Sequence, residues 1–291
     1  MDKKKLGTLY IFITALLFST GGLFIKLLTW SPLAINAARS AVSVLVIGTY
    51  LKLEKVPLKV NKYVLLGAVC MSATNNLYVV ANKLTTAANT ILLQFTAPVF
   101  ILLFMWLFYK EKPKKADVIT SIAVFTGILF FFMDSLQTGN MLGNVLALAS
   151  GATYAVVFML NTFPDAHPVS SIILGHMTSV IIGAPAVFRQ TDFSSKNIIL
   201  LLALGVFQLG VAYILFSKGL EHTPPVTAAL ITGIEPILNP TLVAIFYKET
   251  MTWPALVGGI IVFLSIIVYN VYKSSRPEKK ELVSDAGHDR I

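Results

Sequence analysis

The sequence predicts an all-α integral membrane protein with ten transmembrane helices arranged as two inverted five-helix repeats. The prediction rests on an apolar composition, a series of apolar runs with short connections, and two closely similar segments far apart in the chain. The chain has 291 residues, of which 56% are hydrophobic and 13% are charged, and its mean hydropathy is +0.76. Soluble domains contain about 25% charged residues, so this composition indicates a chain that lies mostly in lipid.

Apolar runs that can cross a bilayer follow one another along the whole chain. A transmembrane helix needs about 20 consecutive, mostly apolar residues. We expect spans at residues 6–28, 32–53, 63–83, 87–109, 116–133, 142–161, 170–188, 197–220, 226–247 and 253–271. The connections leave no room for a soluble domain, and the polar residues 273–291 are expected to form a disordered tail.

Two segments, one in each half of the chain, are nearly alike. Residues 98–111 have the sequence PVFILLFMWLFYKE, and residues 236–249 have the sequence PILNPTLVAIFYKE. They fall in two predicted repeats, residues 1–137 and residues 138–272, with five spans each. Because five is an odd number, the second repeat must cross the membrane in the opposite direction. Inverted repeats of this kind are typical of transporters, whose substrate site lies between the halves near the middle of the bilayer.

Lysine and arginine residues predict the orientation of the spans. Of the 23 Lys and Arg residues, 17 fall on one side of the ten predicted spans and five on the other. Cytoplasmic connections carry the excess of these residues, so both termini are expected in the cytoplasm. The formal charge of +9 has the same origin, and it does not indicate a nucleic-acid partner. The single cysteine, Cys70, excludes an intramolecular disulfide and a cysteine metal cluster.

Short motifs recur in both halves. The first half contains NKLTTAAN at residues 82–89, followed by Pro98-Val99-Phe100 and Tyr109-Lys110-Glu111, and the second contains TAAL at residues 227–230, Glu235-Pro236 and Tyr247-Lys248-Glu249. Together with Arg39 in INAARSAVSVLVI, these motifs resemble the signature of the EamA family of the drug/metabolite transporter superfamily. The resemblance covers about residues 6–271. The chain departs from the family where Lys precedes Glu111 and Glu249 in place of Gly, and where Phe18-Ser19-Thr20 replaces a common tryptophan.

The resemblance implies ten helices around a central cavity lined by the first, third and fourth helices of each half. Family members move small polar metabolites, often amino acids and frequently outward. We therefore expect a secondary transporter in the plasma membrane, working by alternating access on a small-molecule substrate. A multidrug or cationic-amine exporter and a facilitative uniporter stay open as alternatives. Proton coupling also stays open, as does the choice between a monomer and a homodimer.

Charged residues inside predicted spans are the first candidates for a substrate site, because each is costly in hydrocarbon. Glu235 lies near the middle of its span beside Pro236, with Pro240 one turn later, and prolines remove backbone donors and loosen a helix. Arg39 lies within the second span. The two charges either serve the substrate or a proton, or pair with each other to join the halves. His176, close to the repeat position of Arg39, is a candidate for protonation or a hydrogen-bonded packing residue.

The other candidates are polar or aromatic residues within spans, for which hydrogen bonding between helices is the alternative role. They are Asn75, Asn76, Tyr78, Gln94, Tyr154, Gln208, Tyr213 and Asn239. The expected hinges are Pro98, Pro236 and Pro240.

Motifs of other functional classes are missing from the sequence. It contains no H-E-x-x-H zinc motif, no G-x-S-x-G nucleophile elbow and no Walker A sequence. We therefore expect no catalytic residue, no metal site, no cofactor and no direct coupling to ATP. A channel is also disfavoured, because channels usually build their pore from rings supplied by symmetric subunits.

Overall fold

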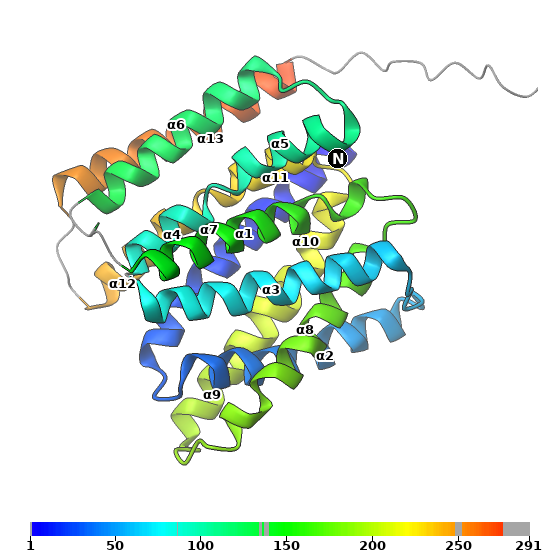
Figure 1. The fold of residues 1–291 in the computed structure, drawn as a ribbon, viewed down its shortest axis with the longest axis vertical. Helices are drawn as coiled ribbons and strands as arrows, with labels where there is room; N and C mark the ends of the chain where they lie inside the picture. The colour runs from blue at the N-terminus through cyan, green and yellow to red at the C-terminus, as the bar shows by residue number, and fades with distance from the viewer. Residues whose placement is uncertain (1, 86, 134–135, 137–139, 248–251, 276–291) are drawn as a thin grey trace, which may run out of the picture.

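Every secondary-structure element is helical in the part of the chain that the computed structural model describes, residues 2–85, 87–133, 136, 140–247 and 252–275 (Figure 1). In that part, eight helical segments are long and apolar enough to cross a membrane. The predicted class, an all-α membrane protein, is therefore confirmed.

The first half of the chain forms α1 (Lys3–Leu27), α2 (Pro32–Leu53), α3 (Lys62–Leu84), α4 (Ala87–Gln94), α5 (Ala97–Tyr109) and α6 (Lys115–Phe132). The second half forms α7 (Met141–Phe158), η2 (Leu160–Thr162), α8 (Pro168–Val187), α9 (Ser195–Ala203), the π-helix η3 (Leu204–Val211), α10 (Ala212–Leu220), α11 (Pro225–Thr232), α12 (Glu235–Tyr247) and α13 (Trp253–Ser275).

Several predicted spans contain more than one helical element. Residues 87–109 form α4 and α5 rather than one helix, and residues 226–247 are likewise divided between α11 and α12. Residues 197–220 are covered by α9, η3 and α10. The predicted tail starts too early, because α13 continues to Ser275. The remainder of that tail, 276–291, lies outside the described residues.

Several helices begin where local chemistry favours a start. The side chain of Asn61 accepts hydrogen bonds from the backbone of Tyr63 and Val64, and Asn140 caps α7 in the same way. Proline occupies one of the first two positions of α2, α5, α8 and α11, where its missing N–H costs no helical hydrogen bond.

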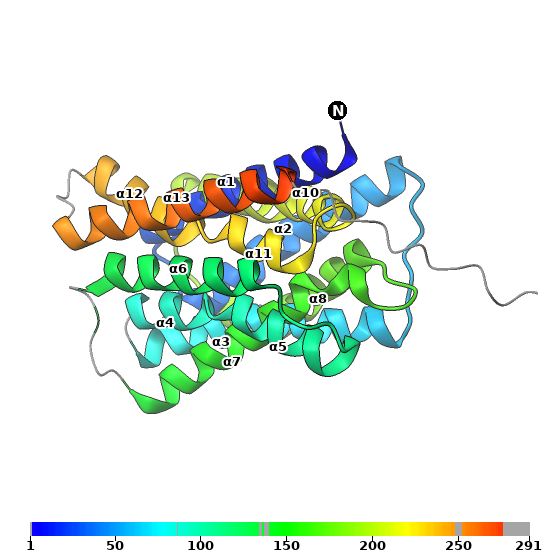
Figure 2. The same cartoon turned by 90° about the horizontal axis from the view of Figure 1, so that it is seen from above.

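Glycines allow the last helices of the two halves to approach closely. Figures 1 and 2 show α6 and α13 side by side along one edge of the molecule, and α13 makes its main contacts with α6. A Cβ atom on Gly258 would lie 2.4 Å from the carbonyl oxygen of Gly127 and 2.4 Å from the backbone nitrogen of Phe131. The backbones therefore cross at a distance that only glycine permits at this position.

Connections at the two ends of the helices fix the direction of α2 and α8. At one end, the backbone N–H of Lys59 donates to the Ser170 hydroxyl over 3.0 Å, and the Asn61 amide donates to the Asp165 carbonyl over 3.1 Å. At the other end, the Trp30 indole donates to the Asp192 carbonyl over 2.6 Å. The end of α2 thus lies beside the start of α8, and these second helices of the two halves run in opposite directions.

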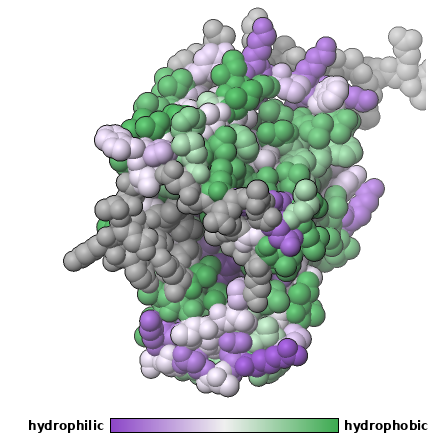
Figure 3. Space-filling view, turned by 60° about the vertical axis from the view of Figure 1, so that its left-hand side comes forward, coloured by the Kyte–Doolittle hydropathy of each residue, from purple (hydrophilic) through white to green (hydrophobic). Residues whose placement is uncertain are grey.

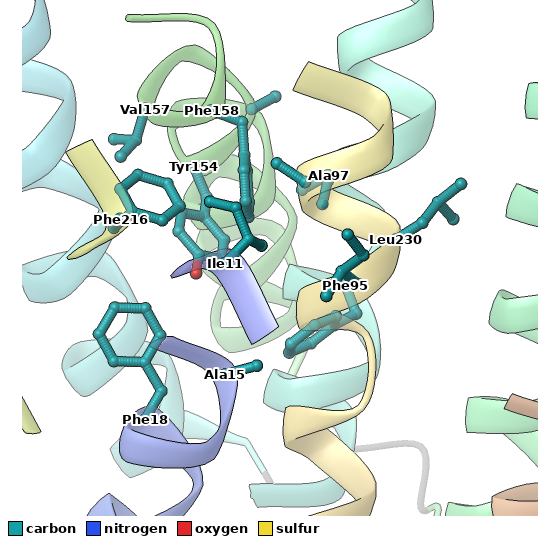
Figure 4. Packing of buried hydrophobic residues seen from close by; sticks show 14 of the residues in the cluster. Ile11, Ala15, Phe18, Phe95, Ala97, Tyr154, Val157, Phe158, Phe216 and Leu230 are labelled. Atoms are coloured by element: carbon teal, nitrogen blue, oxygen red, sulfur yellow. The ribbon is translucent and has the colours of Figure 1, made fainter. Parts of the chain in front are cut away.

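The hydrophobic core lies where helices from both halves meet. Ile11, Ala15 and Phe18 of α1 pack near Tyr154 and Phe158 of α7 and near Phe216 of α10 (Figure 4). Many large apolar side chains are nevertheless exposed, such as Phe108 at 73% and Ile181 at 75%. Figure 3 shows hydrophobic residues over much of one face and hydrophilic ones gathered near its upper and lower margins. Exposed apolar surface of this extent suits contact with lipid.

Candidate functional site

Two helices are interrupted at the same place in the repeat. Between α4 and α5 the chain passes from Gln94 to Ala97, and between α11 and α12 it passes from Thr232 to Glu235. The number of residues between Gln94 and Thr232, and between Ala97 and Glu235, equals the number between Pro98 and Pro236. These two prolines follow the breaks directly, and neither can donate to the carbonyl four residues earlier.

Hydrogen bonds across the two interruptions also match. The backbone N–H of Thr96 donates to the Leu93 carbonyl over 3.3 Å, and that of Ile234 donates to the Ile231 carbonyl over 3.3 Å. The same offset relates three further pairs of donors: Phe95 and Gly233, Val99 and Ile237, and Phe100 and Leu238. The two breaks are therefore the same structural element, formed twice.

Glu235 distinguishes the second interruption from the first. It is the first residue of α12, at the positive end of the helix dipole, where acidic side chains are favoured. Its repeat counterpart is Ala97, which is only 2% exposed. The Glu235 side chain is half-buried, so the acidic group sits inside the helical assembly without being fully enclosed.

Arg39 on α2 is held by two neutral amides. Its Nε and Nη2 donate to the Oδ1 of Asn36 over 3.3 and 3.0 Å, and its Nη1 donates to the Oε1 of Gln208 over 3.1 Å. Gln208 lies in the π-helix η3, a geometry that is often found at functional sites. The guanidinium thus links the two halves through η3.

His176 on α8 lies next to this cluster and is fully buried. Its Nδ1 is 3.2 Å from the hydroxyl of Ser40, and its ring packs edge-on against Tyr213 with centroids 5.1 Å apart. Its Nε2 is buried and has no hydrogen-bond partner among the described residues. Because buried polar groups are normally hydrogen-bonded, this nitrogen is a candidate ligand contact.

Glu235 and Arg39 are close without touching. Glu235 interacts electrostatically with Arg39, Tyr154 and Tyr213. Within the described residues, however, no ion pair joins Glu235 to Arg39. Tyr78 on α3 also lies within electrostatic reach of Arg39. Arg39 and Glu235 therefore lie within electrostatic reach of each other and of Tyr213.

Tyr213 connects several elements of this region. It is the second residue of α10, directly after η3, and its ring lies 4.9 Å from the ring of Phe18 on α1. Asn75 on α3 lies near Tyr213, and its amide donates to the Met71 carbonyl over 3.0 Å. The predicted residues Arg39, Asn75, Tyr78, Tyr154, His176, Gln208, Tyr213 and Glu235 are thus linked to one another, and we call them the charged site.

Other predicted residues make different contacts. Gln94 donates to the Ser150 hydroxyl over 2.7 Å and so joins α4 to α7. Asn76 donates to the Ser72 carbonyl of its own helix over 2.9 Å, while its Oδ1 is buried without a partner in the described part of the chain. The side chains of Asn239 and Pro240 lie outside the described residues.

Some buried polar residues around the charged site were not predicted from the sequence. Asn36, Ser40 and Ser43 lie at one-turn spacing on the face of α2 that carries Arg39, and all are buried, so helical spacing could have identified this polar face. Asp117 was also missed. It is buried near the start of α6 and accepts a hydrogen bond from the Tyr269 hydroxyl over 2.6 Å.

A hydrogen-bonded cluster joins two connections at the end of the molecule opposite Lys59. Asp192 accepts from the hydroxyl of Thr29 over 2.8 Å and from the amide of Asn197 over 2.8 Å. The hydrogen bond from Thr29, with that from the backbone of Ser194, lowers the pKa of the exposed Asp192 carboxyl. The connection at residues 28–31 is thereby fastened to the connection at residues 188–194.

Comparison with known proteins agrees with the fold and identifies the family. The chain is 26% identical to the "Uncharacterized transporter YwfM" of Bacillus subtilis (strain 168), over 98% of this chain and 99% of that protein. It is 25% identical to "Solute carrier family 35 member G1" of Homo sapiens, over 93% of this chain and 81% of that protein.

A solved structure titled "Crystal structure of protein" has the same fold, with a TM-score of 0.79 and 16% identity over 92% of this chain and 98% of that one. The sequence profile of the EamA-like transporter family matches residues 5–133 and again residues 141–271. The chain therefore belongs to the EamA-like transporter family.

Proposed function

We propose that this protein is a secondary transporter that exports a small polar metabolite, an amino acid or a related compound, by alternating access. Membership of a transporter family supports movement of a solute across a membrane. The observation that carries the proposal is the pair of equivalent helix breaks, with Glu235 at one of them and within electrostatic reach of Arg39. Broken helices with polar groups between the halves are typical of substrate sites in secondary transporters.

The proposal includes two inverted repeats, residues 1–137 and 138–272, with both termini in the cytoplasm of a plasma-membrane protein. The opposite directions of α2 and α8 support the inverted arrangement. The excess of Lys and Arg on one side of the predicted spans supports the orientation. A monomer contains both halves and is sufficient for the cycle, and a homodimer of two such units is compatible with it.

In the proposed cycle, the halves rock about the charged site and open it to each side in turn. The breaks before Pro98 and Pro236 lie where the chain has lost helical hydrogen bonds, so bending there costs less than within a continuous helix. Glu235 either binds a positive group of the substrate or exchanges a proton during the cycle. Facilitated transport without a coupling ion is the alternative mode.

One observation favours a second candidate, an exporter of cationic amines. Glu235 interacts with the aromatic residues Tyr154 and Tyr213. A carboxylate among aromatic side chains is a suitable environment for an organic cation. The two candidates differ in whether the substrate also needs an anionic group.

Transport by the purified protein in proteoliposomes tests the proposal. Counterflow of radiolabelled amino acids is compared for the wild type, Glu235→Gln, and Glu221→Gln as a matched control in an exposed turn. We expect Glu235→Gln to lower transport about tenfold or more, which corresponds to about 1.4 kcal/mol, and Glu221→Gln to leave it unchanged. Equal transport by the wild type and Glu235→Gln would remove Glu235 from the mechanism.

A further inference from the structure

The surroundings of Arg39 contain more hydrogen-bond donors than acceptors. A guanidinium has five N–H groups, and three hydrogen bonds from Arg39 go to Asn36 and Gln208. One N–H on each Nη therefore has no acceptor within the described residues. Both acceptors that Arg39 does use are neutral, so no contact from the described part of the chain cancels its charge.

Neighbouring groups add further donors. The Nδ2 of Asn36 belongs to the same amide whose oxygen contacts Arg39, and it is buried with no partner among the described residues. Asn36 is only 3% exposed. The Nε2 of His176 is also buried and has no hydrogen-bond partner among the described residues. If the hydroxyl of Ser40 donates to Nδ1 of His176, then Nε2 carries the proton and becomes a third donor.

We infer that Arg39, Asn36 and His176 form a docking site for the carboxylate group of the transported molecule. A planar carboxylate accepts two parallel N–H bonds from a guanidinium, and it supplies the negative charge that the buried Arg39 lacks. Desolvating an unpaired charge is costly, so a bound anion stabilises this site more than a neutral group of the same shape. Asn36 and Gln208 orient the guanidinium, and a hydrogen bond donated by Ser40 to Nδ1 of His176 places the ring proton on Nε2.

The inference rests on the proposed transport function and narrows its substrate class. Glu235 interacts with Arg39 but does not pair with it. A molecule whose carboxylate binds Arg39 can therefore place a positive group within electrostatic reach of Glu235. The site thus selects small carboxylates, and zwitterions among them, over amines that lack an acid group.

Binding to the purified full-length protein tests the docking site. The probes are the proteinogenic amino acids and small dicarboxylic acids, each beside its neutral amide, with tetraethylammonium as a cation without a carboxylate. Thermal shifts in detergent are measured for the wild type, Arg39→Gln and Asn36→Asp. Lys196→Gln and Asn161→Asp are matched controls at exposed positions.

We expect at least one acid, and not its amide, to stabilise the wild type. Arg39→Gln should weaken its binding about a hundredfold, the scale expected when a buried charge pair is broken. Asn36→Asp keeps the shape of the side chain and its contact with Arg39, so it should fold, but its own carboxylate should exclude the ligand. Lys196→Gln and Asn161→Asp should bind like the wild type.

Equal stabilisation by acid and amide, unchanged binding by Arg39→Gln or Asn36→Asp, or no response to any carboxylate would overturn the docking site. Counterflow in proteoliposomes separates this failure from failure of the transport function. Transport of tetraethylammonium alone would refute the carboxylate site and leave a transporter. Arg39-dependent binding without counterflow of any probe would keep the site and refute transport.

Discussion

The interruption between α4 and α5 and the interruption between α11 and α12 have the same backbone but different chemistry. Their hydrogen bonds correspond at one constant offset in the sequence, and a proline follows each break. The first carries the buried Ala97 where the second carries Glu235. The repeated scaffold therefore supplies a break in each half, and a single substitution makes one of them acidic.

The second helices of the two halves, α2 and α8, also match in position but carry different side chains. Pro32 and Pro168 open α2 and α8, and the offset between them is the same as that between Ser40 and His176. By this offset Arg39 corresponds to Gly175, beside His176. Each half thus contributes one ionisable group to the charged site, basic from the first and acidic from the second. The two halves share a backbone arrangement but differ in the side chains that they place in the charged site.

Transferring the charge from the second break to the first is the strongest way to test this comparison. Ala97→Glu places a carboxylate where the side chain is 2% exposed, and we expect a loss of stability of about 3 kcal/mol, the cost of a charged side chain within a membrane helix. Thermal unfolding in detergent measures it. Glu235→Ala, which removes the counterpart charge, should change stability by less than about 1 kcal/mol. Comparable losses in both variants would mean that the two breaks have similar environments.

The crossing of α6 and α13 tests how closely the last helices of the halves must pack. Gly258→Ala puts a methyl group 2.4 Å from two backbone atoms of α6, so we expect a loss of about 2 kcal/mol. Gly259→Ala is the matched control, because its nearest neighbour is a side-chain atom of Ile237 at 3.3 Å. Equal thermal stability of the two variants would show that the helices separate easily.

Replacing each proline separates the role of the backbone from that of the charge. Pro98→Ala and Pro236→Ala restore an N–H and allow a more continuous helix. We expect each to slow counterflow about tenfold with little change in substrate affinity, because conformational steps often limit turnover. A loss of rate in Pro236→Ala alone would place the hinge in the second half only.

The smallest effect is expected at the connection held by Asp192. Its pKa is lowered by the hydrogen bond from Thr29 and then by that from the backbone of Ser194. The ionised form therefore stabilises the fold above the unfolded pKa of about 4, and this contribution is lost as the pH falls through the lower folded value. Asp192→Asn should flatten the acid side of the stability profile slightly. A profile unaffected by Asp192→Asn would contradict the role of these hydrogen bonds.

Hydropathy predicted where the helices lie better than it predicted the breaks and irregular turns within them. The limits of α2 were correct at both ends, because proline and polar residues mark them. The division of residues 87–109 into two helices was not expected, since an apolar run carries no sign of a break except Pro98. The π-helix η3, which packs against α1 and α2, was not predicted from the sequence.

The sequence predicted which residues form the charged site but not which of them contact one another. Arg39 and Glu235 stand out because charges are rare within spans. The contact between Arg39 and Gln208 joins residues 169 positions apart, which no local pattern predicts. Asp117 resembles a solvated acid in a first helical turn, and only its contact with Tyr269 on α13 shows that it is buried.

Labelling of two equivalent positions from the two sides of the membrane tests the central claim most directly. Lys114 and Thr252 directly precede α6 and α13, and the offset that relates the two helix breaks relates them too. In a chain carrying Cys70→Ser, Lys114→Cys and Thr252→Cys are treated in intact cells with a membrane-impermeant maleimide. Inverted halves predict that Thr252→Cys is labelled from outside and that Lys114→Cys is labelled only after the membrane is opened. Labelling of both from the same side would contradict the inverted arrangement and the charged site between the halves.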